Sequence, residues 1–195
     1  LAALYGLGVD NALIRVSGQE VPVCDGSASK WVDAIEAAGL IEQSEERSVF
    51  CIDKVFEFRD GERCFLAQAG EGLSIQVNVS FPHTAIGRES MHLVLSPEVF
   101  KEEVAWARTF GFEEDLAAMR AMGLGKGGSL DNALVFGKEG VLNPGGLRGP
   151  KEVVRHKMLD LIGDLALSGC RFQGHLVVDR PGHAFTHKVL QALQP

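Results

Sequence analysis

Residues 153–164 read VVRHKMLDLIGD, and this stretch carries the clearest periodic pattern in the chain. At about 100° per residue in a helix, its polar side chains fall within roughly a quarter of the circumference. Such a narrow polar stripe is not typical of a solvated helix face. The pattern therefore predicts a helix over 152–168 whose polar groups point into a cleft. The polar stripe consists of His156, Lys157, Asp160 and Asp164, and the apolar remainder of Val154, Met158, Leu159, Leu161, Ile162 and Leu165.

His156 and Asp160 are four residues apart, so their side chains project from successive turns and can meet one cation. Imidazole nitrogen and carboxylate oxygen both suit Zn²⁺, and Fe²⁺ also suits this ligand set. A catalytic zinc site uses three protein ligands, so the third has to come from outside this helix. The alternative is a row of ion pairs on an exposed face, with Lys157 pairing to Asp160 or Asp164.

The phrase Pro181-Gly182-His183-Ala184 places a histidine on a turn, at the start of a helix expected over 183–193. Imidazole titrates near neutral pH, so His183 is a candidate general acid or base. The alternative is a surface or capping histidine. His187 follows one turn later and admits the same two interpretations.

Residues 108–112 (RTFGF), with Thr109, and 127–132 (GGSLDN) form a third candidate region. A threonine hydroxyl can help to stabilise an oxyanion, and glycines allow a backbone to approach a ligand closely. The alternative is an ordinary helix end followed by a turn. The glycine spacing over 123–128 is too loose for a dinucleotide-binding motif, and no strand is expected before it.

The rest of the chain mixes strands and helices, which indicates an α+β fold of the two-layer sandwich type. Asp60-Gly61 predicts a hairpin turn between two strands, and we expect a domain boundary in the polar segment 41–48. Asp25 and the serines after it are expected to cap a helix that ends at Gly39. The expected strands are 9–16, 49–51, 56–58, 73–79, 130–136 and 172–179, and the further helices are 28–38, 114–122 and one that opens at Ser96-Pro97.

Composition limits the classes of function. The 195 residues carry 19 Lys and Arg against 26 Asp and Glu, a net charge of −7, without a basic run, which argues against a nucleic-acid groove. No apolar stretch approaches the roughly 20 residues of a membrane span, and there is no signal-peptide pattern. Four scattered cysteines indicate reduced thiols and a cytoplasmic protein.

Seven phrases in order make the sequence similar to one known family. They are GLGVDNALI at 6–14, DGSAS at 25–29, ARTFGF at 107–112, GGSLDNALV at 127–135, VLNPGGLR at 141–148, VRHKMLDLIGDL at 154–165 and PGHA at 181–184. Across essentially the whole chain they closely resemble the zinc-dependent UDP-3-O-acyl-N-acetylglucosamine deacetylases of lipid A (lipopolysaccharide) biosynthesis.

The resemblance implies two domains, each a sheet layered against helices, with the active site between them. It implies that His156 and Asp160 bind zinc and that Lys157 assists the oxyanion and the anionic part of the substrate. Thr109 would bond the tetrahedral intermediate, and His183 would be the general acid, held by Asp164.

The resemblance also implies a substrate site. Phe81 would contact the UDP-sugar substrate, and residues 113–135 would form a β-α-β insert whose apolar passage houses the acyl chain. The family suggests a monomer. The expected lining of the passage is Leu116, Met119, Gly128, Ser129 and Val135.

The sequence departs from the family pattern in three places. Family members carry a Glu-His pair just before the phrase that matches residues 1–4; its histidine is the third zinc ligand and its glutamate the general base. The 195 residues contain no Glu-His pair, so we expect residues 1–45 to be an incomplete first domain and 46–195 the second. Pro181 replaces a usual Ser, and Thr186-His187 a usual Asn-Asn, which would tune the loop.

The expected function is a zinc amidohydrolase that releases acetate and a free 2-amine from UDP-3-O-acyl-N-acetylglucosamine. One alternative is a catalytically incomplete fragment or a non-catalytic binder of the nucleotide sugar or acyl chain. Another is a hydrolase of a different acetamide, against which the acyl passage over 113–135 argues.

Overall fold

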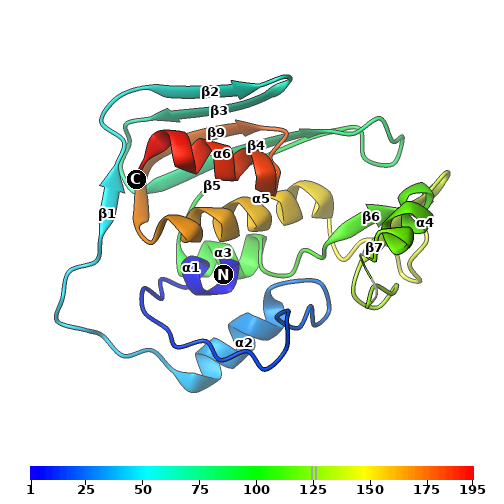
Figure 1. Ribbon diagram of the computed structural model, residues 1–195, viewed down its shortest axis with the longest axis horizontal. Coiled ribbons are helices and arrows are strands. Elements are labelled where there is room, and N and C mark those ends of the chain that lie inside the picture. The colour runs from blue at the N-terminus through cyan, green and yellow to red at the C-terminus, as the bar shows by residue number, and fades with distance from the viewer. Residues whose placement is uncertain (124, 126) are drawn as a thin grey trace.

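The computed structural model describes residues 1–123, 125 and 127–195, without the side chains of Met119 and Arg120. It confirms the α+β class: two sheets are packed with helices (Figure 1). None of the helices in the described ranges is both long and apolar enough to cross a membrane.

The larger sheet has the strand order β2-β3-β9-β4-β5. Its centre is β9, which runs antiparallel to β3 and parallel to β4, while β1 pairs in parallel with the first residues of β9. The hairpin expected at Asp60-Gly61 is confirmed, since Asp60 of β2 pairs with Arg63 of β3. The strands are β1 (Val49–Cys51), β2 (Phe56–Asp60), β3 (Arg63–Gln68), β4 (Leu73–Ser80), β5 (Arg88–Val94) and β9 (Arg171–Asp179).

The smaller sheet projects from this body together with one helix (Figure 1). It consists of β6 (Phe110–Phe112), β7 (Leu134–Gly137) and β8 (Gly140–Val141), and α4 (Glu113–Ala121) follows β6. The predicted helix is therefore present. The strand expected over 130–136 is shorter, because residues 130–132 form a turn before β7 begins.

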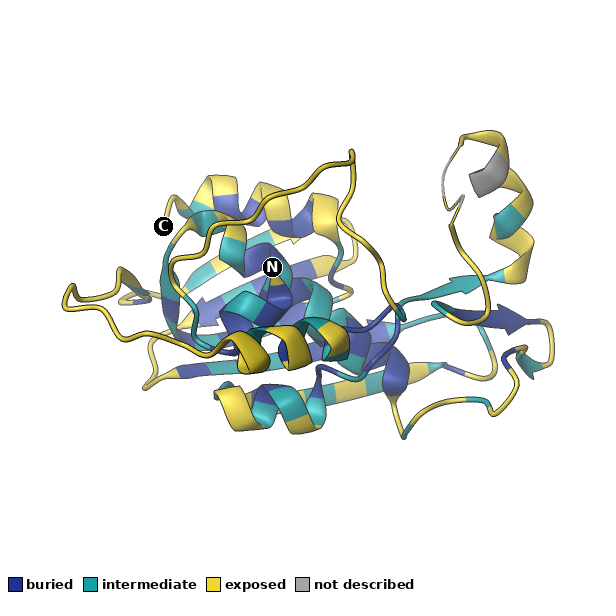
Figure 2. Cartoon of the chain, turned by 90° about the horizontal axis from the view of Figure 1, so that it is seen from below, coloured by how far each residue is buried: buried dark blue, intermediate teal, exposed yellow. Residues whose placement is uncertain are grey.

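One face of the larger sheet is covered by helices. Residues of β4 and β9 alternate between buried and half-buried, as a sheet with one covered face requires. Figure 2 shows the buried residues gathered between this sheet and the helices. The remaining helices are α1 (Ala2–Gly6), α2 (Ser29–Ala38), α3 (Pro97–Glu103), α5 (Glu152–Leu165) with a 3₁₀ turn (Ala166–Ser168), and α6 (His183–Leu193).

The apolar side of α5 is the centre of the core. Met158, Leu161, Ile162 and Leu165 are fully buried. Gly163 faces α1, and a Cβ at this position would lie in ordinary van der Waals contact with that of Ala2, at 3.4 Å. The pattern of 153–164 thus predicted the buried helix correctly.

Two sequence-based predictions are wrong. Residues 9–16 form no strand, and 10–24 are exposed throughout, because β propensity alone does not hold a strand without a hydrogen-bonded neighbour. The α2 N-cap is Ala28, without a side-chain cap. Asp25 Oδ1 instead accepts hydrogen bonds from the backbone N–H and hydroxyl of Ser27, which closes a turn before the helix.

Other helix ends are as expected. Ser96 Oγ accepts a hydrogen bond from the backbone N–H of Val99 at 3.2 Å, with Pro97 at the first helical position. Gly39 ends α2 with φ at +78°. The boundary expected at 41–48 lies in an exposed segment without helix or strand, and the division into domains at that point stays a prediction.

The backbone around Gly26 leaves no room for a larger side chain, and this constraint can be measured. A Cβ at Gly26 would collide with the carbonyl of Asn132, whereas a Cβ at Gly8 meets nothing within 4 Å, and both residues have a similar positive φ. We expect Gly8→Ala to cost about 1 kcal/mol of unfolding free energy from its φ alone. Gly26→Ala should cost about 1–3 kcal/mol more, from the overpacking.

Urea denaturation of the two variants measures this difference, because the cost of the positive φ is nearly the same in both and cancels. Equal losses of unfolding free energy would contradict the close approach of the 25–29 turn to Asn132.

Candidate active site

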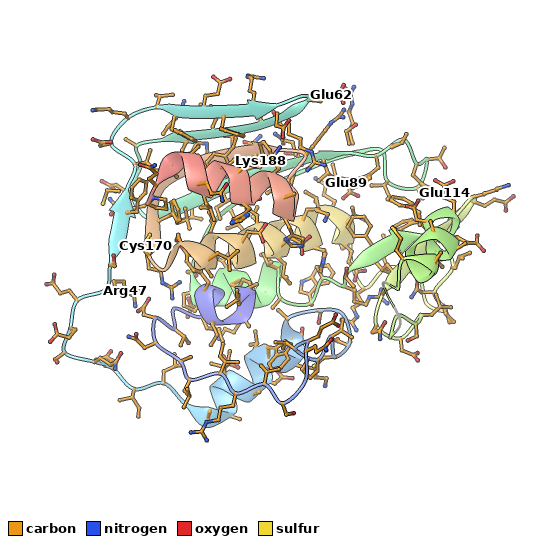
Figure 3. The ribbon with its side chains drawn as sticks, in the orientation of Figure 1. Arg47, Glu62, Glu89, Glu114, Cys170 and Lys188 are labelled. Atoms are coloured by element: carbon orange, nitrogen blue, oxygen red, sulfur yellow. The ribbon has the colours of Figure 1, made fainter. Side chains whose placement is uncertain are left out.

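The first turn of α5 is held by two carboxylates. Lys151 at the N-cap is left-handed and provides no side-chain cap, so the first backbone N–H groups of the helix need other acceptors. Glu89 of β5 accepts the hydrogen bond of Val154 N–H at 3.1 Å. Figure 3 shows Glu89 beside this end of α5. Burial raises the pKa of Glu89.

Glu152 is the second carboxylate, and it is fully buried. It accepts hydrogen bonds from Arg108 through Nε at 2.9 Å, Nη2 at 3.2 Å and the backbone N–H at 3.1 Å. The backbone N–H of Arg148 donates a fourth bond at 2.7 Å. The carboxylate therefore joins the segment before β6 to the start of α5.

His156 is oriented by a carbonyl in that same segment. Its side chain is buried, and Nδ1 lies 3.0 Å from the carbonyl oxygen of Ala107. Because a carbonyl only accepts hydrogen bonds, Nδ1 carries a proton and donates it. The other nitrogen, Nε2, then faces Asp160 Oδ1 at 3.3 Å. The edge of the Phe110 ring packs against the imidazole, with centroids 6.3 Å apart.

Asp160 stays ionised although it is mostly buried. Burial opposes its ionisation, but the hydrogen bond and charge of His156, together with Lys157, outweigh burial and hold the pKa of this carboxyl well below its usual range. Lys157 Nζ lies 2.8 Å from Oδ2, which leaves Oδ1 directed at the imidazole.

His183 approaches the same carboxylate from α6. Its Nδ1 lies 2.8 Å from Oδ1 of the buried Asp164, and its Nε2 lies 3.9 Å from Asp160 Oδ1. The imidazole is 70% exposed, so it is accessible to a substrate. The hydrogen bond that the His183 ring donates to Asp164 is the main reason why the pKa of His183 is raised, with the charge of Asp160 adding to it against burial.

A pocket of about 330 Å³ lies beside these residues. Lys157, Arg63 and Arg180 supply positive charge to its wall, and Phe81 lies in the same wall. Arg180 is also paired with Glu62, which Figure 3 labels at the tip of the β2–β3 hairpin. The remaining lining residues are Asp60, Glu62, Val79, Ser80 and Pro181.

Aromatic rings join this pocket to the smaller sheet. Phe81 packs edge-to-face on Phe110, with centroids 5.5 Å apart, and Lys157 Nζ lies 5.2 Å from the centroid of the Phe110 ring. Phe112 and Phe136 continue the cluster. His83 connects the loop after β4 to β7, because its Nε2 lies 2.8 Å from the carbonyl oxygen of Gly137.

The structure thus brings together five candidate residues of α5 and α6. They are His156, Lys157, Asp160, Asp164 and His183. The helix face is not exposed, although the alternative ion pair between Lys157 and Asp160 does form. Among the described residues, no group of three or more His, Cys, Asp or Glu side chains is placed to hold a metal ion. His187 is exposed one turn beyond His183.

Thr109 and the insert residues are less closely connected to α5. Thr109 is held through its backbone, whose N–H donates to the Gly26 carbonyl at 2.8 Å and whose carbonyl accepts from Leu134 N–H at 2.8 Å. The described pocket beside α5 is lined by none of the expected passage residues. Val135 is buried, Leu116 half-buried, Gly128 and Ser129 exposed, and the side chain of Met119 lies outside the described residues.

Sequence reasoning missed five residues of this region. Glu152 had a signal, since a charged residue opens a largely apolar helix, and Arg180 had another, since it directly precedes the Pro-Gly-His turn. Arg108 and Phe110 lie in the phrase ARTFGF, in which only Thr109 was given a role, and Arg63 carried no comparable pattern.

Comparison with known proteins gives one consistent result. Residues 1–195 match the family described as "LpxC: UDP-3-O-acyl N-acetylglycosamine deacetylase". A protein of Nitratidesulfovibrio vulgaris is 41% identical over 194 residues, and one of Anaeromyxobacter sp. is 42% identical over 191 residues. Both are named UDP-3-O-acyl-N-acetylglucosamine deacetylase, and the alignments cover 100% and 98% of this chain. The chain spans 63% of the length of each.

The Glu152 contacts predict a large effect on stability. Glu152→Ala leaves Arg108 buried without its partner, so we expect a loss of about 3–5 kcal/mol of unfolding free energy. The matched control is Glu103→Ala, which removes a partly exposed ion pair with Arg155 and should cost about 1 kcal/mol or less. Urea denaturation measures both, and a similar loss in the two variants would contradict the importance of the buried pair.

The Asp164 contact predicts the titration of His183. In the metal-free chain, Asp164→Asn should lower the pKa of His183 toward the ordinary value of 6.5, because the main cause of its elevation is removed. The raised pKa stabilises the fold below pH 6.5, and this contribution is lost as the pH rises through the folded-state pKa.

Proton NMR titration of the His183 ring measures this pKa. The control is Asp179→Asn, which alters a carboxylate bonded to Asn78 on the opposite side of the sheet. An unchanged His183 pKa in Asp164→Asn would rule out Asp164 as its cause.

Proposed function

Because the chain belongs to the UDP-3-O-acyl N-acetylglycosamine deacetylase family, we propose that its protein hydrolyses the acetamide of UDP-3-O-acyl-N-acetylglucosamine. The products are acetate and the free 2-amine, a step of lipid A biosynthesis. The observation that carries the proposal is the convergence of His156 Nε2 and Asp160 Oδ1, 3.3 Å apart, beside His183.

The proposed ligands of a zinc ion are His156 and Asp160, and their chemistry fits one. With Nδ1 donating to Ala107, His156 directs Nε2 at a carboxylate oxygen. In the metal-free chain the Nε2 proton lies between them, and a neutral His156 would present a lone pair at that place. Two acceptors at this distance repel each other unless a proton or a cation lies between them. The Nδ1 hydrogen bond to a carbonyl is also the usual support of a metal-binding imidazole.

Zinc bound there would supply a water of lowered pKa and a polarised carbonyl, and Fe²⁺ also suits these ligands. By resemblance, the third ligand and the general base are a Glu-His pair, which these 195 residues do not contain. The pair supported here is therefore two of three ligands.

His183 is proposed to deliver a proton to the leaving amine. Its Nδ1 is held by Asp164, so Nε2 is the nitrogen that faces the reaction centre. The raised pKa keeps more of this imidazole protonated near neutral pH, which a general acid requires. Lys157 and Thr109 are proposed to stabilise the oxyanion.

The substrate is proposed to extend from this centre in two directions. The pocket is proposed to take the diphosphate of the nucleotide on Lys157, Arg63 and Arg180, whose three positive charges outnumber the two carboxylates, Asp60 and Glu62, in the same wall. Phe81 would contact the sugar. The acyl chain would enter the 113–135 insert, with the lining expected from Leu116, Met119, Gly128, Ser129 and Val135. We place the reaction in the cytoplasm and propose a monomeric enzyme.

The test is acetate release from UDP-3-O-acyl-N-acetylglucosamine by the product of the complete reading frame. We expect His183→Ala to lower kcat by about 10²–10⁴-fold while zinc content is unchanged, because only a proton donor is lost. His156→Ala should lose the zinc as well. The matched control is His187→Ala on the same helix, which should retain activity.

Two outcomes would contradict the proposal. One is the absence of acetate release by the unsubstituted protein loaded with zinc. The other is unchanged kcat in His183→Ala, which would remove the assigned proton donor.

A further inference from the structure

The open face of the larger sheet carries two histidines that the proposed reaction does not use. His92 lies on β5 and His175 on β9, with β4 between them. Ser74 of β4 pairs with His175, and Gln76 pairs with His92. Buried residues alternate with these along β4 and β9, so the two histidines and Ser74 point away from the covered face.

The two imidazole rings converge on a single atom. Ser74 Oγ lies 2.8 Å from Nε2 of His92 and 2.9 Å from Nδ1 of His175. The ring centroids are 5.9 Å apart, and the ring planes meet at 61°. Two nitrogens from separate strands are therefore directed at one point above a small side chain.

The hydroxyl has a single proton, so it can donate to only one of the two ring nitrogens at a time. Ser74 donates its single proton to one nitrogen and accepts an N–H from the other. One of the two facing nitrogens thus already presents a lone pair. The second presents one when its proton moves to the other nitrogen of the same ring, a change between neutral tautomers.

We propose that His92 and His175 bind a divalent late first-row transition-metal ion, with Cu²⁺ held most tightly. Neutral imidazole is a good ligand for Zn²⁺, Ni²⁺ and Cu²⁺, and the order of stability places Cu²⁺ first. A bound ion would replace Ser74 Oγ as the common partner of the two nitrogens. His92 is exposed, so its ring is free to rotate inward to metal–nitrogen bonding distance.

Water completes the coordination of this ion. Among the described residues no third His, Cys, Asp or Glu joins the two rings, so the site is weaker than a structural zinc site with four protein ligands. It is also separate from the His156–Asp160 pair, because α5 packs on the covered face of the same sheet.

The experiment is a Cu²⁺ titration of the chelator-treated chain, followed by calorimetry and by electron paramagnetic resonance. We expect His92→Ala and His175→Ala each to weaken one class of Cu²⁺ site about tenfold or more, since each removes one of two imidazoles. The resonance spectrum of that class should change from two coupled nitrogens to one. The matched control is His187→Ala, an exposed histidine of α6, which should leave this class unchanged.

Any Cu²⁺ held at His156 and Asp160 is present in all these variants and cancels in the comparison. Ser74→Ala retains both imidazoles and should retain the two-nitrogen spectrum. Wild-type affinity and spectrum in both His92→Ala and His175→Ala would overturn the proposal. So would equal weakening in His187→Ala, because binding would then be nonspecific.

Discussion

The buried contact between Arg108 and Glu152 is the constraint on which the candidate site depends. A buried ion pair is not strongly stabilising by itself, because removing two charges from water costs nearly as much as their attraction returns. Its consequence here is positional. Glu152 accepts three bonds from Arg108 and one from Arg148, so these bonds hold the backbone before β6 over the first turn of α5.

The position of the backbone before β6 determines the tautomer and the orientation of the His156 ring. Ala107, the neighbour of Arg108, supplies the carbonyl that accepts from Nδ1, and this bond directs Nε2 at Asp160. A shift of this backbone would free the imidazole to change its tautomer or to rotate. The acidic residue that starts α5 therefore positions a nitrogen one turn later, through the segment before β6 rather than through the helix itself.

The sequence predicted α5, the β2–β3 hairpin, β4 and β9 well, because each has a strong period or a specific turn signal. It failed at 9–16, where an apolar run has no strand beside it, since pairing partners are a tertiary property. For the site, helical spacing predicted that His156 and Asp160 meet. It did not predict Ala107, Arg108 or Phe110, because contacts between α5 and a distant segment leave no local pattern.

Asp160 shows why the polar stripe has to be narrow. One of its oxygens faces two imidazole nitrogens, and the other binds Lys157, so every neighbour of this carboxylate favours its charged form. Lys157 also lies over the Phe110 ring and in the wall of the adjacent pocket. A wider polar face would admit water and weaken these interactions, since their strength depends on a low local dielectric. The apolar residues around the stripe thus support both the core and the electrostatics of the site.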